Sequence, residues 1–125
     1  MAKNRLAIPI GESKGLDSIV FEHFGRAPYF IFVDIENGKV TDFWVEENPA
    51  VEHAPGLIPK YLKDKGVDVV IVRGIGFRAV KNFEAYGIAV IRGAEGRVKD
   101  ILERFLRGEL ADKPYTPKSR FHERE

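Results

Sequence analysis

The sequence predicts one α/β domain built on a five-stranded mixed sheet. The second half of the chain alternates helix-like and strand-like segments, which is typical of parallel strands joined by crossover helices. The first half contains an Asn37–Gly38 pair between two apolar runs, a strong signal for an antiparallel hairpin. The length of 125 residues, of which 44% are hydrophobic, suits one core and is too short for two.

Three strands are expected in the first half. Leu6–Ile10 is a short apolar run in which Pro9 indicates an exposed or terminal position in the sheet. Tyr29–Ile35 is aromatic and β-branched, a composition typical of strands. Val40–Val45 follows directly after the hairpin turn, so we expect it to pair antiparallel to the segment before it.

The second half predicts three helices and two strands. Apolar residues recur at helical spacing in three segments, which stop at Gly66, Gly87 and Gly108. The strands between them, Val67–Val72 and Ile88–Ile91, are almost wholly apolar, as expected for strands buried on both faces of a sheet. The last helix is expected to bury Val98, Ile101, Leu102, Phe105 and Leu106.

The handedness of the connections fixes the order of these strands. Right-handed crossovers make the first, fourth and fifth strands parallel, which leaves the second as the antiparallel member. The order 3-2-1-4-5, with helices on both faces of the sheet, satisfies this condition. The chain leaves the first and fourth strands in opposite directions, and ligands of open α/β sheets bind at such a switch point. The loops expected to meet there are 11–26, 73–78 and 92–96.

Composition argues against several classes of function. With 20 basic and 19 acidic residues the net charge is +1, so no overall field attracts nucleic acid or a membrane surface. The chain has no cysteine, and therefore neither a disulfide nor a thiolate. None of its serines stands in a G-x-S-x-G nucleophile motif, and nothing else indicates a self-sufficient enzyme. With no membrane-length apolar run and no signal-like start, we expect a cytoplasmic protein.

The segment Glu22–Arg26 carries the first candidate site. The His23 imidazole can ligate a metal or titrate near neutral pH. The Arg26 guanidinium offers a planar fork for an anion, and Gly25 allows the backbone to approach a ligand closely. The alternative interpretation is a turn before a strand, with an exposed histidine and a solvated arginine.

A second histidine, His53, lies in the loop before the first helix. Together with His23 and a carboxylate it would make a plausible metal site. The carboxylates within reach in the sequence are those of Asp17, Glu22 and Glu52. The alternative is an unrelated surface histidine. His122, in the polar tail, is assigned no role.

Gly74 and Gly76 follow a predicted strand and open a predicted helix. With Ala79 they fit the G-x-G-x-x-A pattern of dinucleotide-binding turns, in which helix amides meet a pyrophosphate. The next strand, however, ends in Arg92 where a ribose-binding acid is expected, and no second nucleotide-binding half follows. A tight packing turn is therefore favoured, with a small-anion or nucleotide site as the alternative.

Several short stretches, taken together, match a known family. They are Ala7–Ile10, Asp17–Ser18, Glu22–Phe30, Asn48, Gly56, Gly66–Ile71, Gly74–Gly76, Ala79 and Gly87–Ile88. In this order and at these intervals they resemble the dinitrogenase iron–molybdenum cofactor biosynthesis domain of NifX-like nitrogenase accessory proteins. The His-Phe-Gly-Arg-Ala stretch that begins at His23 is the most specific of them. The resemblance implies a three-layer, ribonuclease H-like fold over residues 1–110, followed by a polar tail at 111–125.

The resemblance also implies a function without catalysis. Members of the family hold or carry iron–sulfur or iron–molybdenum cofactor precursors during assembly, which implies a metal-cluster donor or acceptor protein as partner. His23 is the cluster ligand that the resemblance implies, with Arg26 and nearby backbone at Gly25, Gly74 and Gly76 offsetting negative charge.

His53 matches a histidine in the same loop of relatives, although Ala54–Pro55 replaces their glycine-containing sequence. Stable iron–sulfur clusters are usually held by several thiolates, so a chain without cysteine should bind such a cargo weakly and release it easily. The remaining alternative is an interaction module that uses the polar tail, Lys113–Glu125, as a docking segment.

Overall fold

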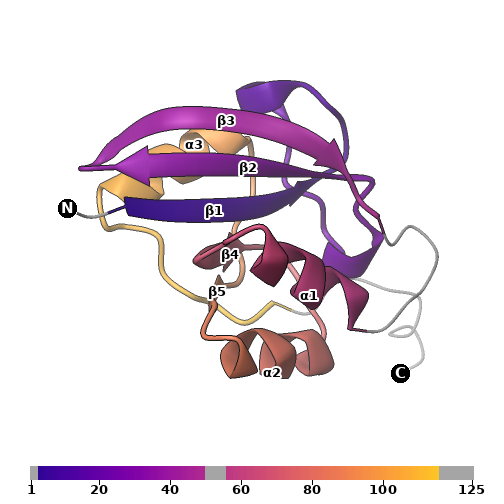
Figure 1. Cartoon of the computed structure of the whole chain (residues 1–125). Coiled ribbons are helices and arrows are strands. Elements are labelled where there is room, and N and C mark those ends of the chain that lie inside the picture. The colour runs from indigo at the N-terminus through magenta and orange to yellow at the C-terminus, as the bar shows by residue number, and fades with distance from the viewer. Residues whose placement is uncertain (1–2, 50–55, 116–125) are drawn as a thin grey trace.

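Figure 1 shows the architecture of the computed structural model, which describes residues 3–49 and 56–115. The strands are β1 (Lys3–Ile10), β2 (Tyr29–Glu36), β3 (Lys39–Glu47), β4 (Val69–Ile71) and β5 (Ala89–Ile91). The helices are α1 (Leu57–Asp64), α2 (Phe77–Ala85) and α3 (Val98–Leu106), and two 3-10 turns, η1 (Gly15–Asp17) and η2 (Phe24–Arg26), lie between β1 and β2. No helix in these two ranges is long and apolar enough to cross a bilayer.

The strands form one sheet in the order β3-β2-β1-β4-β5. β1 pairs parallel with β4, and β4 pairs parallel with β5, whereas β2 is antiparallel to both β1 and β3. This confirms the predicted strand order and the antiparallel place of β2. The hairpin turn also forms as predicted, because Asn37 and Gly38 adopt φ angles of 54° and 79°, the left-handed conformation that a two-residue turn requires.

Helices cover both faces of the sheet, as a three-layer fold requires (Figure 1). α1 and α2 pack on one face and α3 on the other. The alternation along β1 supplies both cores, since Leu6 and Ile8 pack on the α3 side and Ala7 packs on the α1–α2 side. The α1–α2 core is rich in aromatic rings, with Phe32 stacked on Trp44 at 5.4 Å between centroids.

β4 and β5 are shorter than the sequence predicts, with three residues each. Beyond them the chain leaves regular strand geometry but continues to form backbone bonds. The Val72 N–H donates to the Ile91 carbonyl at 2.8 Å, and the Ala94 N–H donates to the Val72 carbonyl at 3.0 Å. The apolar run therefore extends past the strand, because these bonded loops are buried as well.

Two residues differ in burial from the expectation. Leu106 is 39% exposed, because the buried stripe of α3 passes through Val98, Ile101 and Leu102, and Leu106 lies about 90° around the helix from its centre. Pro9 is buried, but it stands near the end of β1, past the two residues that pair with β4. Its missing N–H therefore interrupts no bond between β1 and β4.

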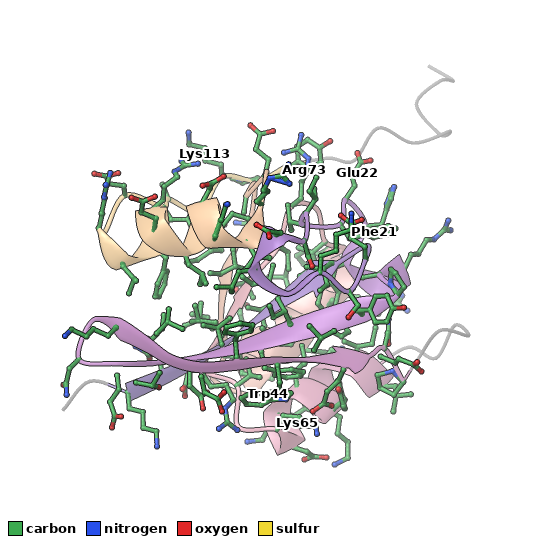
Figure 2. The ribbon with its side chains drawn as sticks, turned by 90° about the horizontal axis from the view of Figure 1, so that it is seen from above. Phe21, Glu22, Trp44, Lys65, Arg73 and Lys113 are labelled. Atoms are coloured by element: carbon green, nitrogen blue, oxygen red, sulfur yellow. The ribbon has the colours of Figure 1, made fainter. Side chains whose placement is uncertain are left out.

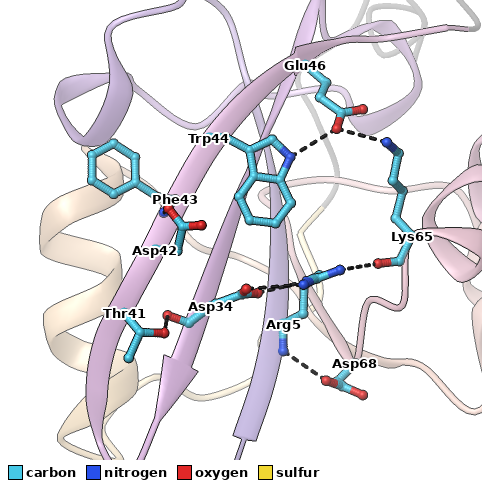
Figure 3. Close-up of polar contacts among 9 residues, drawn as sticks. All are labelled: Arg5, Asp34, Thr41, Asp42, Phe43, Trp44, Glu46, Lys65 and Asp68. Atoms are coloured by element: carbon cyan, nitrogen blue, oxygen red, sulfur yellow. Dashed lines mark hydrogen bonds and ion pairs between the residues drawn. The ribbon is translucent and has the colours of Figure 1, made fainter.

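β3 forms an irregular edge of the sheet. Its pairing with β2 shifts register between Asp34 and Ile35, which leaves Thr41 as an extra residue in a bulge. Beside the bulge, the Asp42 carboxylate accepts a hydrogen bond from the backbone N–H of Phe43 at 2.8 Å (Figure 3). A bulge and an acidic side chain are two of the devices that blunt an edge strand.

A network of polar contacts fixes α1 against β3 (Figure 3). Glu46 Oε2 accepts hydrogen bonds from Trp44 Nε1 and Lys65 Nζ, each at 2.9 Å, and the Tyr61 hydroxyl donates to Glu46 Oε1. Burial acts to raise the pKa of Glu46, but the three hydrogen bonds outweigh it and hold this pKa below its usual value. Burial, together with the bond to Glu46, raises the pKa of Tyr61.

Arg5 ties β1 to β2 and to the turn before β4. Its Nε and Nη2 donate to the two carboxylate oxygens of Asp34 at 2.7 and 3.1 Å, and its Nη1 donates to the Lys65 carbonyl at 2.7 Å. Its backbone N–H donates to Asp68 at 2.8 Å. Arg5, Asp34 and Asp68 line an open depression at this end of the sheet. Because their polar groups already bond to one another, we assign these residues a role in stabilising the fold.

Candidate functional site

The loops that follow β1, β4 and β5 come together at the opposite end of the sheet. Short backbone bridges join them: Ile10 pairs with Val20, Ile19 with Arg97, and His23 with Gly74. We call this end the mouth, defined by loops 11–26, 73–78 and 92–96. It lies at the switch point that the strand order predicts.

His23 is fixed at the mouth by its own backbone. The Gly74 N–H donates to the Glu22 carbonyl and the Phe24 N–H donates to the Gly74 carbonyl, each at 3.0 Å, so the His23 peptide lies in a parallel ladder with the loop after β4. The Phe24 ring anchors the next turn, since it is buried with its centroid 5.6 Å from that of Phe83. The backbone that carries the half-buried His23 side chain is therefore fixed in position.

Two buried polar side chains shape the loops around His23. The Ser18 hydroxyl donates to the Glu12 carbonyl at 2.9 Å and accepts from the Lys14 N–H at the same distance. The Asn48 amide donates to the Ala27 carbonyl at 2.8 Å. Both residues belong to the stretches on which the family resemblance rests, and both act by satisfying backbone groups in the loops.

Arg26 and Gly25 lie on the outside of η2, and both are exposed. The turn is closed by a hydrogen bond from the Arg26 N–H to the His23 carbonyl at 3.0 Å, so Arg26 follows His23 within one turn of chain. Among the described residues, no hydrogen bond or ion pair engages the Arg26 guanidinium. A Cβ on Gly25 would have no atom within 4 Å, which leaves open space beside the turn.

Gly74 and Gly76 differ in what they do. Both backbone groups of Gly74 are engaged by the loop of His23, so its amide is already used inside the protein. Gly76 is exposed at the start of α2, with a φ of −75° that any residue adopts. Phe77, the next residue, is 76% exposed. The arrangement agrees with the packing-turn interpretation of this glycine pattern.

The mouth has two flanks, one on each side of the sheet. Glu22 directly precedes His23, and the backbone of both residues runs beside loop 73–78. Figure 2 shows Glu22, Arg73 and Lys113 on the α3 side, and Trp44 and Lys65 on the α1–α2 side.

The second histidine cannot be added to this geometry, because His53 lies outside the described residues. Its convergence with His23 stays a prediction. Within residues 3–49 and 56–115, no group of three or more histidine, cysteine, aspartate or glutamate side chains is arranged to hold a metal ion.

The structure adds a contact that the sequence does not predict. The described part of the tail is bound to the mouth through Asp112 and Tyr115. The bonds with Arg92 lower the pKa of Asp112, and the hydrogen bond to Glu22 raises the pKa of Tyr115. The only signal in the sequence is a tyrosine within an otherwise polar segment, which has no periodicity to interpret.

Fold and site together define a small three-layer α/β domain with a loop-built mouth at its switch point and few ligands of its own. The chain belongs to the dinitrogenase iron–molybdenum cofactor family, whose model matches residues 4–108. The family is one of accessory domains for this cofactor, which confirms the resemblance found in the sequence.

Relatives with solved structures share the fold. The structure of PH0822 superposes with a TM-score of 0.80 at 41% sequence identity, covering 87% of this chain and 96% of that one. A NifB-like protein of the DUF35 family from Thermotoga superposes with a TM-score of 0.74 at 32% identity, covering 93% and 98%. The protein MJ0580 of Methanocaldococcus jannaschii is 29% identical over 109 residues, which are 85% of this chain and 88% of that protein.

Proposed function

We propose that the protein is a non-enzymatic carrier that binds an iron–sulfur or iron–molybdenum cofactor precursor at the mouth. The observation that carries this proposal is the backbone ladder between His23 and Gly74, which fixes the peptide of His23 at the switch point. The membership of the family supports the same class of cargo. Binding requires no chemical step from the protein.

Each residue at the mouth has a distinct part in this proposal. His23 supplies a nitrogen ligand to the metal. Arg26, whose guanidinium has no partner among the described residues, offsets the negative charge of a sulfide-rich cargo. Gly25 and Gly76 leave room for the cargo beside the backbone, and Gly74 holds the peptide of His23. His53 is the candidate second ligand.

The lack of cysteine sets the expected strength of binding. Clusters that stay in a protein are usually held by several thiolates, which this chain of 125 residues does not contain. One or two imidazoles and an arginine give a cargo that exchanges. The proposed partner is therefore a metal-cluster donor or acceptor protein, and the proposed location is the cytoplasm.

Anaerobic reconstitution with ferrous iron and sulfide tests the proposal. The native protein should take up metal and develop charge-transfer absorbance, and His23→Ala should lose it. His122→Ala, which removes the histidine with no assigned role, is the matched control and should load as the native protein does. His53→Ala decides whether a second imidazole takes part. Equal loading of His23→Ala and the native protein, or no loading of either, contradicts the proposal.

A further inference from the structure

After α3 the chain turns back and runs beside the end of β5 to the mouth. Asp112 accepts three hydrogen bonds from Arg92: from its backbone N–H at 2.7 Å, from Nε at 2.9 Å and from Nη2 at 2.8 Å. The Lys113 N–H donates to the Arg92 carbonyl at 2.9 Å. Backbone and side-chain bonds together fix this segment to loop 92–96.

Tyr115 extends the attachment to the other two loops. Its ring centroid lies 4.0 Å from the guanidinium carbon of Arg73, and its hydroxyl donates to Glu22 Oε2 at 2.7 Å. Arg73 also pairs with Glu95 at 3.0 Å. One tyrosine therefore joins loop 11–26 to loop 73–78, and Arg73 joins both to loop 92–96.

The segment packs so closely on loop 92–96 that a side chain at Gly93 would collide with it. A Cβ at Gly93 would lie 2.5 Å from the Lys113 carbonyl oxygen, well inside contact distance. Gly93 also has a φ of 85°, which side chains rarely adopt. Gly96, in the same loop, has a φ of 99° but no atom within 4 Å of a Cβ. Of these two glycines, only Gly93 makes room for the segment.

We propose that residues 112–115 form a clasp that positions the His23 loop from the α3 side of the sheet. Glu22 directly precedes His23 and its carbonyl accepts the Gly74 N–H, so holding the Glu22 side chain on the α3 side restrains the peptide that carries His23. Tyr115 and Arg73 are positioning residues in this scheme. The clasp lies beyond residues 4–108, which the family model matches.

Hydrogen exchange of the protein alone tests the clasp. Gly93→Ala should displace Lys113, and Tyr115→Ala should remove the ring and the hydroxyl. Each should speed exchange of the Phe24 and Gly74 amides by about tenfold, because those amides form the ladder that carries His23. Gly96→Ala introduces the same backbone strain without touching the segment, and should leave both amides at their native rates.

Unchanged exchange in both clasp variants would overturn the proposal, and so would equal acceleration by Gly96→Ala. The melting temperature of each variant identifies any that has simply lost its fold. Tyr115→Phe keeps the ring over Arg73 and loses only the hydrogen bond, so its exchange rates should fall between those of the native protein and Tyr115→Ala.

A second measurement connects the clasp to the cargo and rests on the proposed function. In anaerobic titration with ferrous iron and sulfide, Tyr115→Ala should bind about tenfold more weakly than the native protein, in step with its exchange rates. Tighter binding by Tyr115→Ala would mean that the tyrosine covers the site, which contradicts a positioning role. If exchange is faster in the clasp variants but neither they nor the native protein load metal, the result contradicts the carrier function and still supports the clasp.

Discussion

Single side chains in this protein do two kinds of work, and Glu46 and His23 illustrate the difference. Glu46 accepts hydrogen bonds from three donors in and next to β3 and α1, so its carboxylate stabilises the fold. His23 is held by backbone bonds on both sides while no hydrogen bond or ion pair of its side chain is found among the described residues. A fixed peptide with an unengaged imidazole is the arrangement expected of a ligand-binding residue.

At the residue scale, Glu46→Gln should destabilise the protein by about 1–2 kcal/mol at neutral pH, because a charge-assisted bond to Lys65 is lost. The folded-state pKa of Glu46 is lowered, so its contribution is present above the ordinary value of 4.5 and is lost as pH falls through the lower folded value. Urea unfolding should therefore show the gap between variant and native protein closing in acid.

The exposed pair between Lys60 and Asp64, also on α1, is the control for this measurement. Asp64→Asn should cost only about 0.3–0.5 kcal/mol, because both side chains of the pair are largely exposed. An equal loss in the two variants would show that the Glu46 network adds nothing beyond a surface ion pair.

Among the elements, those with a strong local pattern were predictable and those made by tertiary contact were not. Asn37 and Gly38 alone determine the hairpin, and the apolar residues of Leu6–Ile10 identify a strand, which the structure shows to be buried on both faces. The ends of β4 and β5 were missed, since their apolar neighbours bond as loops. The contact of Tyr115 with Glu22 spans 93 positions and has no local signal.

The candidate site was predictable in the same partial way. Strand order brings the loop of His23 to the loop of Gly74, and the sequence predicts that meeting. The sequence also favoured a packing turn at Gly74, in agreement with the bonds that both of its backbone groups make. The sequence did not predict that Tyr115 would contact both Glu22 and Arg73, because that contact depends on the path of the chain after α3.

At the element scale, α3 offers a paired test of burial. Ile101→Ala should cost about 3 kcal/mol, because Ile101 is fully buried in the core beneath α3. Leu106→Ala, on the same helix, should cost less than about 1 kcal/mol because Leu106 is 39% exposed. Denaturant unfolding of the two variants gives both values, and similar losses would show that the end of α3 is packed more tightly than the structure has it.

At the scale of the whole molecule, the two ends of the sheet are built differently. One end is closed by Arg5 and Asp34, whose charges neutralise each other, and the other presents the mouth with Arg26 exposed. α2 and α3 begin at or next to the mouth, and the strands before them, β4 and β5, pair with each other. Ion pairs therefore stabilise both ends, with Arg5–Asp34 at one end and Arg73–Glu95 and Arg92–Asp112 at the mouth.

The nucleotide alternative makes a prediction for the whole protein. A nucleotide at a hundred times its dissociation constant would add about 2.7 kcal/mol of stability and raise the melting temperature. We expect no shift with any of the common nucleotides, because the Gly74 amide already donates to the Glu22 carbonyl. A clear shift that Gly76→Ala removes would restore the nucleotide interpretation.

The irregular margin at β3 has a consequence for how such a protein behaves in a crowded solution. A carrier has to bind other proteins and dissociate from them again. An open, regular edge strand would instead favour stable edge-to-edge association between copies of the chain. The kink at Thr41 and the acid beside it discourage such stacking. The proposed carrier function requires repeated encounters with other proteins, and this edge offers them no regular strand to extend.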